Sequence, residues 1–427
     1  MNAQPASFAT LESYMSDVGQ NARVAARRLA TASPAEKRTA LLATADALAD
    51  SRDSILTANA DDVDNGRQKG LSEAMLDRLR LDEDRLEGIA GSVRAVADQP
   101  EPVGQVLESW DQPNGLRFQK VAVPMGVIGM IYESRPNVTV DAAALCLKSG
   151  NAVILRGGSE AVKSNHALHA AILGGLRAAG FPETAVQLIG TQDRDAVGLM
   201  LGGLDGAVDL IIPRGGKGLV GRVQQDARVP VLAHLDGLNH TYVHASADAD
   251  MAVAVVANAK MRRTGICGST ETVLVDRAIA ASIVPPLIGT LIGLGCEVRG
   301  DAESTTLDSR IVPATPSDFA TEHLAPVLNL AIVENIDAAL AHISRHGSGH
   351  TDAIIASDPN AVQRFFADVD SAIVLHNAST QFADGGEFGF GAEIGIATGR
   401  VHVRGPVGAK HLTTFKYLVS GDGTLRP

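Results

Sequence analysis

Cys267 has the residue type and setting with the clearest chemistry in this chain. It stands between two glycines and closely follows Lys260, Arg262 and Arg263. A thiol reacts as its thiolate, which nearby cations and backbone N–H groups favour. Small neighbours also let an electrophilic carbon approach the sulfur. The pattern predicts a nucleophile on a loop before a strand at residues 272–275. The alternative is that Cys267 is a small apolar residue on that loop.

Two glycine-containing loops each follow an expected strand and precede an expected helix. The first contains Arg156 and Ser159, and the second contains the pattern Gly-x-Gly-x-x-Gly at residues 216–221, preceded by Arg214. Backbone N–H groups at such helix starts bind phosphate, so both loops are candidate phosphate sites. A tight turn is the alternative for the second loop. No Walker A lysine motif is present in the sequence, which argues against ATP use.

Two further polar segments could contribute to a site. The loop at residues 134–139 follows the first buried strand, and the Asn137 amide could donate to an oxyanion; the alternative is an ordinary turn. Residues 342–352 contain three histidines. We expect no His-x-x-x-His pair with a third ligand on a helix, so we predict no metal site and place these histidines at the surface or at the edge of the active site.

Composition excludes several classes of protein. The chain of 427 residues is 45% hydrophobic and 20% charged, as expected for a globular α/β protein, and its net charge of −12 argues against a nucleic-acid partner. The three cysteines form no CxxC pair, which indicates a reducing, cytoplasmic compartment. The N-terminus lacks the apolar core of a signal peptide. The uncharged run at residues 278–296 contains prolines and glycines, so we expect a buried helix and no membrane span.

Apolar periodicity predicts an α/β fold. Helices are expected in the first hundred residues, where residues 33–36 form a capping box with proline at the first helical position. Short apolar strands alternate with helices from residue 124 to about 231, which predicts a parallel sheet covered on both faces. A second α/β region runs from about residue 240 to 380 and contains Cys267.

A hairpin and a tail strand lie outside these two regions. The hairpin is predicted near residues 110–123, and the tail strand at residues 412–419. A lone hairpin is marginally stable in water, and exposed strand edges pair readily with another chain. We therefore expect a sheet between subunits of a symmetric homo-oligomer. The alternative is a monomer in which the tail strand pairs with the hairpin of its own chain.

Taken in order, several segments of the chain resemble the gamma-glutamyl phosphate reductases, also called glutamate-5-semialdehyde dehydrogenases. This family is the proline-biosynthesis branch of the aldehyde dehydrogenase superfamily. The resemblance is carried by residues 124–137, 211–216, 234–237, 263–267, 342–352, 382–389 and 404–406. It implies an aldehyde dehydrogenase-like α/β fold, with a doubly wound dinucleotide-binding domain, an α/β catalytic domain and a small β element for oligomerisation.

The resemblance also implies domain boundaries. We assign an NADP-binding domain to residues 1–107, 124–236 and 385–411, and a catalytic domain to residues 237–384. The oligomerisation strands are then residues 108–123 and 412–427.

The activity that the resemblance implies is NADPH-dependent reduction of L-glutamyl 5-phosphate. The products are phosphate and L-glutamate 5-semialdehyde, formed through a cysteine thioester. Glutamate 5-kinase, which supplies the substrate, is a candidate partner. Two alternatives stay open: another NADP-dependent semialdehyde dehydrogenase, and a catalytically silent dinucleotide-binding scaffold subunit.

Carried over residue by residue, Cys267 matches the catalytic nucleophile of the family. Asn137 matches the asparagine that, with the Cys267 backbone N–H, holds the oxyanion. Arg156 occupies the place of the superfamily's lysine beside the adenosine ribose. Ser159 falls where NAD-preferring relatives often have a glutamate that binds both ribose hydroxyls, so NADP is favoured, although Glu160 is adjacent.

The resemblance also assigns the rest of the cofactor site, and two positions of this chain differ from the related sequences. The cofactor loop includes Arg214, Gly215 and Gly216. Glu387 resembles the glutamate that binds the nicotinamide ribose. His234 stands at about the place of the general-base glutamate of hydrolytic aldehyde dehydrogenases. The loss of that water-activating base suits an enzyme whose thioester must react with hydride rather than with water. Asn239 replaces a cysteine that the family often has.

Overall fold

The computed structural model describes residues 10–426 of the chain. Within them, residues 10–233, 389–395 and 407–426 form one compact unit, and residues 234–388 and 396–406 form the other. The expected cofactor domain included all of residues 385–411. Residues 234–236, 385–388 and 396–406 of that expected domain cluster with the second unit instead. In the last of these segments the strands β14 (Ile396–Ala397) and β15 (Gly405–Pro406) pair with each other. Residues 1–9 and 427 of the expected domains lie outside the described residues, and so does this first part of the N-terminal segment considered for a signal peptide.

The first unit begins with five helices, as the sequence predicts. They are α1 (Leu11–Ala30), α2 (Pro34–Asp50), α3 (Arg52–Gln68), α4 (Glu73–Leu79) and α5 (Glu83–Asp98). Ser33 accepts a hydrogen bond from the Glu36 backbone, and the Glu36 carboxylate accepts one from the Ser33 backbone, so the predicted capping box is confirmed.

A parallel sheet in the order β5-β4-β3-β6 forms the core of the first unit. Its strands are β3 (Val127–Tyr132), β4 (Ala152–Gly157), β5 (Val186–Leu188) and β6 (Leu210–Arg214). The helices that follow them are α6 (Asn137–Lys148), α7 (Val162–Ala178), α8 (Asp195–Leu201) and α9 (Lys217–Asp226), with a 3₁₀ helix η1 (Glu183–Ala185) before β5. All of β3 and β4 is buried, which confirms the expectation of continuously apolar, doubly covered strands.

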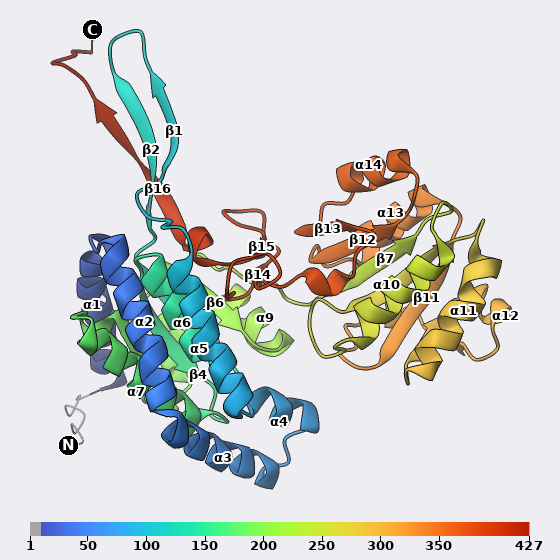
Figure 1. The fold of residues 1–427 in the computed structure, drawn as a ribbon, viewed down its shortest axis with the longest axis horizontal. Helices are drawn as coiled ribbons and strands as arrows, with labels where there is room; N and C mark the ends of the chain where they lie inside the picture. Colours follow the sequence, from blue (N-terminus) through green and yellow to red (C-terminus); the bar gives the residue numbers. More distant parts are fainter. Residues whose placement is uncertain (1–9, 427) are drawn as a thin grey trace. The chain divides into compact units, whose positions relative to one another are not determined.

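Helices cover the sheet of the first unit on both faces (Figure 1). Right-handed crossovers place α6 and α7 on one face, because β3, β4 and β5 advance in one direction across the sheet. The connection through α8 returns to β6, and α8 contacts α1, which packs along β3, β4 and β5. Loops follow the carboxyl ends of these strands, and ligands of such sheets bind at that edge.

A three-stranded antiparallel blade extends from the first unit (Figure 1). We call β1 (Val106–Asp111), β2 (Arg117–Pro124) and β16 (Thr413–Ser420) the strand blade; β2 lies at its centre, and the 3₁₀ helix η4 (Ala409–Leu412) leads into β16. The hairpin and the tail strand are therefore confirmed, and they pair within one chain. Aromatic rings line one face: Trp110 stacks on Phe118 at 5.3 Å between centroids, and Tyr417 lies 6.1 Å from Trp110.

The second unit contains a seven-stranded parallel sheet in the order β10-β9-β11-β8-β7-β12-β13. Its strands are β7 (Asn239–Val243), β8 (Thr270–Asp276), β9 (Glu297–Gly300), β10 (Val312–Pro313), β11 (Val327–Val333), β12 (Thr351–Ile355) and β13 (Ile373–His376). Its helices are α10 (Ala249–Met261), α11 (Ala280–Gly293), α12 (Ser304–Leu307), α13 (Ile336–His346) and α14 (Pro359–Asp368), with 3₁₀ helices η2 (Asp318–Ala320) and η3 (Thr380–Phe382).

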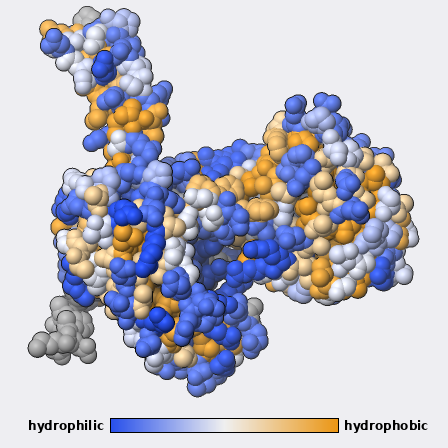
Figure 2. Space-filling view, viewed as in Figure 1, coloured by the Kyte–Doolittle hydropathy of each residue, from blue (hydrophilic) through white to orange (hydrophobic). Residues whose placement is uncertain are grey.

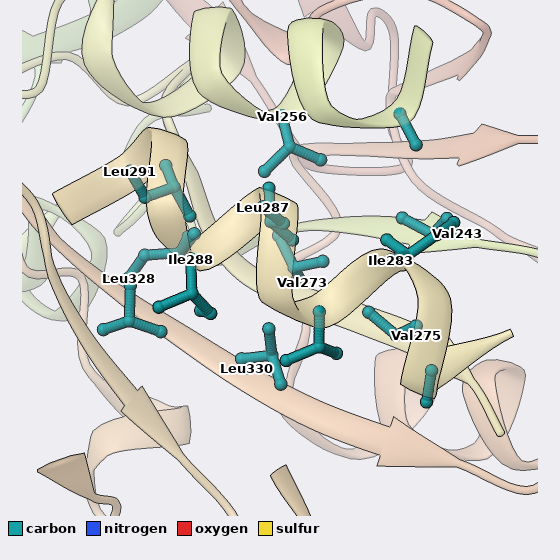
Figure 3. Close-up of a cluster of buried hydrophobic side chains, with 14 of the residues drawn as sticks. Val243, Val256, Val273, Val275, Ile283, Leu287, Ile288, Leu291, Leu328 and Leu330 are labelled. Carbon is teal, nitrogen blue, oxygen red and sulfur yellow. The ribbon is translucent and has the colours of Figure 1, made fainter. Parts of the chain in front are cut away.

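Alternation along β8 explains how this sheet holds a helix layer on each face. Val273 and Val275 pack with α10 and α11, whereas Leu274 packs toward α13 and α14. In Figure 3, Leu287 and its neighbours on α11 lie against side chains of β8 and β11. The uncharged run at residues 278–296 is thus a buried helix, as expected, and none of the described helices is long and apolar enough to cross a membrane.

Candidate active site

Three chemistry-bearing residues lie at the amino ends of neighbouring strands in the second unit. Cys267 precedes β8, His234 precedes β7, and His350 immediately precedes β12. The sheet order places β8, β7 and β12 side by side, and all are parallel, so their amino ends meet at one edge. Ligand sites of open α/β sheets normally lie at the opposite, carboxyl edge. Topology therefore explains why these three residues meet although they are far apart in sequence.

The thiol and the two imidazoles form one compact cluster. One ligating atom from each of Cys267, His234 and His350 lies within 4.8 Å of the others, and the two rings meet edge to face at 5.0 Å between centroids. His234 Nδ1 lies 2.7 Å from the Ile396 carbonyl oxygen. A carbonyl only accepts, so Nδ1 carries a proton, and Nε2 is the nitrogen whose protonation can change.

His350 is the most deeply buried member of this cluster. Its side chain has no exposed surface, and its Nδ1 lies 2.8 Å from the Thr351 hydroxyl. Its Nε2 is buried and makes no hydrogen bond that meets the usual geometric criteria. A buried polar atom without such a partner is costly in a folded protein. Its neighbour in this cluster is the half-buried Cys267 thiol, so electrostatic attraction to a thiolate is the compensation available.

The imidazoles determine the protonation of the thiol. Burial by itself raises the pKa of Cys267, but the charges of His350 and His234 outweigh burial and hold that pKa well below its ordinary value. The nucleophile prediction relied on Lys260, Arg262 and Arg263 instead. Lys260 is buried in an ion pair of 2.8 Å with Glu271, so that cation is neutralised by its own partner.

Asn239 and Gly237 fix the position of the Cys267 loop. The Asn239 amide nitrogen donates to the carbonyls of Cys267 at 2.6 Å and Ser269 at 2.9 Å, and its oxygen accepts from the Thr351 N–H at 3.2 Å. One buried side chain on β7 thus connects the nucleophile loop to the residue after His350. A Cβ on Gly237 would lie 2.2 Å from the Cys267 carbonyl oxygen, so the close approach there requires glycine.

A cleft of about 730 Å³ lies in the first unit, beside the carboxyl ends of β3 and β4. Two predicted cofactor residues, Arg156 and Ser159, are among its lining residues. The Arg156 guanidinium donates to the Gly157 carbonyl, and its buried Nε makes no hydrogen bond. The Glu160 carboxylate accepts from the Ser134 N–H at 2.6 Å and hydroxyl at 2.7 Å, so it is already engaged.

The other predicted cofactor residues are not among the lining residues of this cleft. The Gly216 N–H donates to the Glu133 carboxylate at 3.0 Å, and an added Cβ on Gly215 would lie 2.5 Å from the same carboxylate. The Arg214 guanidinium lies 3.2 Å from the Glu393 carboxylate. Glu387 belongs to the second unit, where it is exposed beside a small cavity. Their contacts with a cofactor stay predictions.

Asn137 begins α6 in the first unit, whereas Cys267 belongs to the second. The Asn137 amide nitrogen donates to the Asp141 carboxylate at 2.8 Å. The amide nitrogen carries a second N–H that this bond does not use, so the side chain keeps one donor for a ligand. The predicted pairing of Asn137 with the Cys267 N–H at an oxyanion stays a prediction.

The histidine segment needs one correction. We expected no His-x-x-x-His pair on a helix near a third ligand, but His342 and His346 lie one turn apart on α13, with 4.6 Å between ring centroids, and His342 lies 5.4 Å from His240. Burial, with the charge of His240, lowers the pKa of His342 to about 3. The neutral His342 ring packs edge to face against Phe319, so we assign it a role in packing.

Sequence reasoning drew attention to residues 342–352 but gave neither His350 nor His234 a catalytic role. Their approach to Cys267 depends on the strand order, which the local pattern does not contain. The sequence signal for His350 was its place in the histidine-containing segment 342–352, one of the segments that carry the family resemblance. Asn239 was noticed as a departure from the family, and its three hydrogen bonds show what that side chain does here.

Comparisons with known proteins agree with this architecture. The family model of the aldehyde dehydrogenase family matches residues 10–306. The chain is 57% identical over 419 residues to the gamma-glutamyl phosphate reductase of Rhodopseudomonas palustris strain HaA2, covering 98% of this chain and 97% of the relative. It is 58% identical over 413 residues to that of Caulobacter vibrioides, covering 97% and 100%. The crystal structure of the Thermotoga maritima gamma-glutamyl phosphate reductase superposes with a TM-score of 0.94 at 41% identity, covering 97% and 100%.

The imidazole pair leads to a prediction about the reactivity of the thiol. Iodoacetamide should alkylate Cys267 rapidly at neutral pH, and His350→Ala should slow the reaction at least about tenfold, because only a few per cent of a thiol with an ordinary pKa of about 8.5 is thiolate there. Peptide mapping by mass spectrometry over a pH series measures this, with a chelator present because Cys and His also bind zinc.

Three controls belong to this experiment. Burial raises the pKa of Cys146 and raises that of Cys296 to about 11, so both should stay unmodified. His166→Ala, at an exposed position of α7, should leave the profile unchanged. A His350→Ala profile identical to the wild type would contradict the assigned role of the imidazole.

Proposed function

This chain belongs to the gamma-glutamyl phosphate reductases of the aldehyde dehydrogenase family, and from that membership we propose how its own residues carry out the reaction. The reaction is the reduction of L-glutamyl 5-phosphate to L-glutamate 5-semialdehyde and phosphate by a nicotinamide dinucleotide, a step of proline biosynthesis. The observation that carries the proposal is the Cys267 thiol beside the imidazoles of His234 and His350.

In the first step, the Cys267 thiolate attacks the acyl carbonyl carbon of the substrate. A C–S bond forms, and the carbonyl oxygen becomes an oxyanion that the Asn137 amide and the Cys267 N–H stabilise. The oxyanion then collapses, the C–O bond to phosphate breaks, and the thioester remains. An imidazolium of His234 or His350 next to the sulfur can give its proton to the departing phosphate.

The second step converts the thioester to the aldehyde. When bound, the nicotinamide cofactor would supply a hydride to the acyl carbon of the thioester. Asn137 and the Cys267 N–H again stabilise the resulting oxyanion, whose collapse breaks the C–S bond and returns the thiolate. The same two imidazoles stabilise that thiolate, and the imidazole that gave its proton to phosphate takes up one proton from solvent, which restores the starting charge state.

The lining of the first-unit cleft supports NADP, the phosphorylated cofactor, as the preferred one. Arg156 is 7% exposed there, its Nε has no hydrogen-bond partner, and Glu160 is bonded to Ser134. Ser159 leaves space where a ribose-binding carboxylate would repel a phosphate. The charge of Glu160 acts on Arg156, but within the described residues the guanidinium forms no ion pair with a carboxylate, and such a guanidinium suits the 2′-phosphate of NADP. The three described cysteines are free, which supports a reducing cytoplasmic location.

The strand blade supports a homo-oligomer. On β16, Phe415 is 44% exposed, Tyr417 55% and Val419 50%. Figure 2 shows apolar side chains along this blade. Both outer strands, β1 and β16, are edges within the described residues. A thin sheet with an aromatic face and open edges is unfavourable in water, and pairing with another copy would bury both.

The reverse reaction tests the proposed chemistry. Reduction of NADP with glutamate 5-semialdehyde should require inorganic phosphate, because phosphate is the group that releases the thioester. Cys267→Ala should lower the rate at least about a thousandfold while NADPH binding by calorimetry stays intact. Cys296→Ala is the matched control and should keep full activity. Phosphate-independent oxidation would instead indicate a hydrolytic dehydrogenase.

Cofactor preference tests the role of Arg156. Arg156→Ala should raise the KM for NADPH roughly 10- to 100-fold and change the KM for NADH little, because it removes charged hydrogen bonds to the 2′-phosphate worth about 1.5–3 kcal/mol. Steady-state kinetics with both cofactors measures this. Arg177→Ala, at an exposed position paired with Glu183, is the control. Equal losses with both cofactors would show that Arg156 does not recognise the 2′-phosphate.

A charge on the aromatic face of the blade should prevent assembly. Light scattering should find wild-type oligomers and monomeric Tyr417→Glu at micromolar concentration, because the carboxylate would be desolvated in the interface. Thr414→Glu places the same charge on the same strand but on the other face, and should assemble. A wild-type monomer would rule out the proposal.

A further inference from the structure

The Asn137 amide has a carboxylate partner that the reaction, as derived above, does not use. Asp141 follows Asn137 by one helical turn on α6, so the two side chains share a face. The Asn137 Nδ2 donates to Asp141 Oδ2 at 2.8 Å. Both residues belong to the first unit, so this contact lies within one compact body.

We propose that Asp141 is a positioning residue that orients the Asn137 amide for the oxyanion. An ionised carboxylate only accepts hydrogen bonds, so it holds the amide nitrogen on its own side and excludes the amide oxygen. The remaining N–H of Asn137 then stays available to a substrate oxyanion. Without Asp141 the amide can turn over and present its oxygen, which repels an oxyanion. The proposal rests on the oxyanion role proposed for Asn137.

The groups that face Asp141 make its charge sensitive to pH. Burial raises the pKa of Asp141 to about 7, the bond from Asn137 and the charge of Arg214 lower it, and the charge of Glu393 raises it. Arg214 ends β6 and lies 3.2 Å from Glu393, with both side chains mostly buried. A neutral Asp141 can donate its own proton to the Asn137 oxygen, which reverses the amide.

The direction of the effect follows from these charges. Above about pH 7 Asp141 is ionised and holds the Asn137 nitrogen. As pH falls through this value, that constraint is lost and turnover should decline. The Cys267 thiolate titrates well below its ordinary range, so alkylation of Cys267 should not show the same decline.

The test is a double-mutant cycle on kcat with Asn137→Ala and Asp141→Leu. Asn137→Ala should lower kcat on the order of 10²–10³-fold, as expected for loss of one oxyanion donor. Asp141→Leu should lower kcat at least about tenfold and leave the KM for NADPH unchanged. In the Asn137→Ala background, Asp141→Leu should have no further effect, because no amide remains to orient.

Three further measurements keep the result interpretable. Asp141→Asn keeps an acceptor oxygen but cannot ionise, so it should retain more activity than Asp141→Leu and lose the decline near pH 7. Cys267 alkylation should be unchanged in both variants, which separates an effect on the amide from damage to the nucleophile. NADPH binding by calorimetry confirms that each variant folds, and Asp195→Asn, at an exposed position on α8, is the control.

Additive losses of Asn137→Ala and Asp141→Leu would overturn this inference and leave the proposed function standing. An unchanged pH profile in Asp141→Asn would do the same. Full activity of Asn137→Ala would overturn the oxyanion role itself, and the inference with it. Non-additive losses together with a flattened pH profile would establish Asp141 as the residue that orients Asn137.

Discussion

The attraction between the Cys267 sulfur and the imidazoles of His234 and His350 is the interaction on which the rest of the site depends. Burial alone would keep this thiol protonated and unreactive, and only the two nearby rings reverse that effect. The rings are themselves held from behind, His234 by the Ile396 carbonyl and His350 by Thr351. Parallel pairing of β8, β7 and β12 brings the three loops together, and Asn239 on the central strand sets their spacing.

The two units use opposite edges of their sheets. In the first unit, the cleft that holds Arg156 lies at the carboxyl ends of β3 and β4, as expected for a dinucleotide-binding sheet. In the second unit, the reactive cluster lies at the amino ends of the strands. Asp141, Arg214 and Glu393 then connect the proposed oxyanion residue to the end of β6, where the cofactor loop begins.

Local patterns in the sequence were sufficient for most of the elements. The capping box at Ser33, the buried strand β3 and the Gly-flanked Cys267 were all predicted, because each depends on near neighbours in the chain. The partners of Cys267 were not, since His234 and His350 reach it only after β7 and β12 have paired. For the same reason Lys260 was misjudged: Glu271, 11 residues away in sequence, neutralises it in the folded chain. The Asn137–Asp141 pair could have been found from its helical spacing, but its significance depends on burial beside Arg214 and Glu393.

Trapping the covalent intermediate tests the central claim most directly. Protein incubated with glutamate 5-semialdehyde and NADP in phosphate-free buffer should accumulate one acyl group per chain, because the thioester forms but lacks the phosphate that releases it. Intact-mass spectrometry followed by peptide mapping should locate that group on Cys267, and added phosphate should remove it. An adduct on another residue, or NADPH formed in one equivalent per chain with no adduct, would contradict the account.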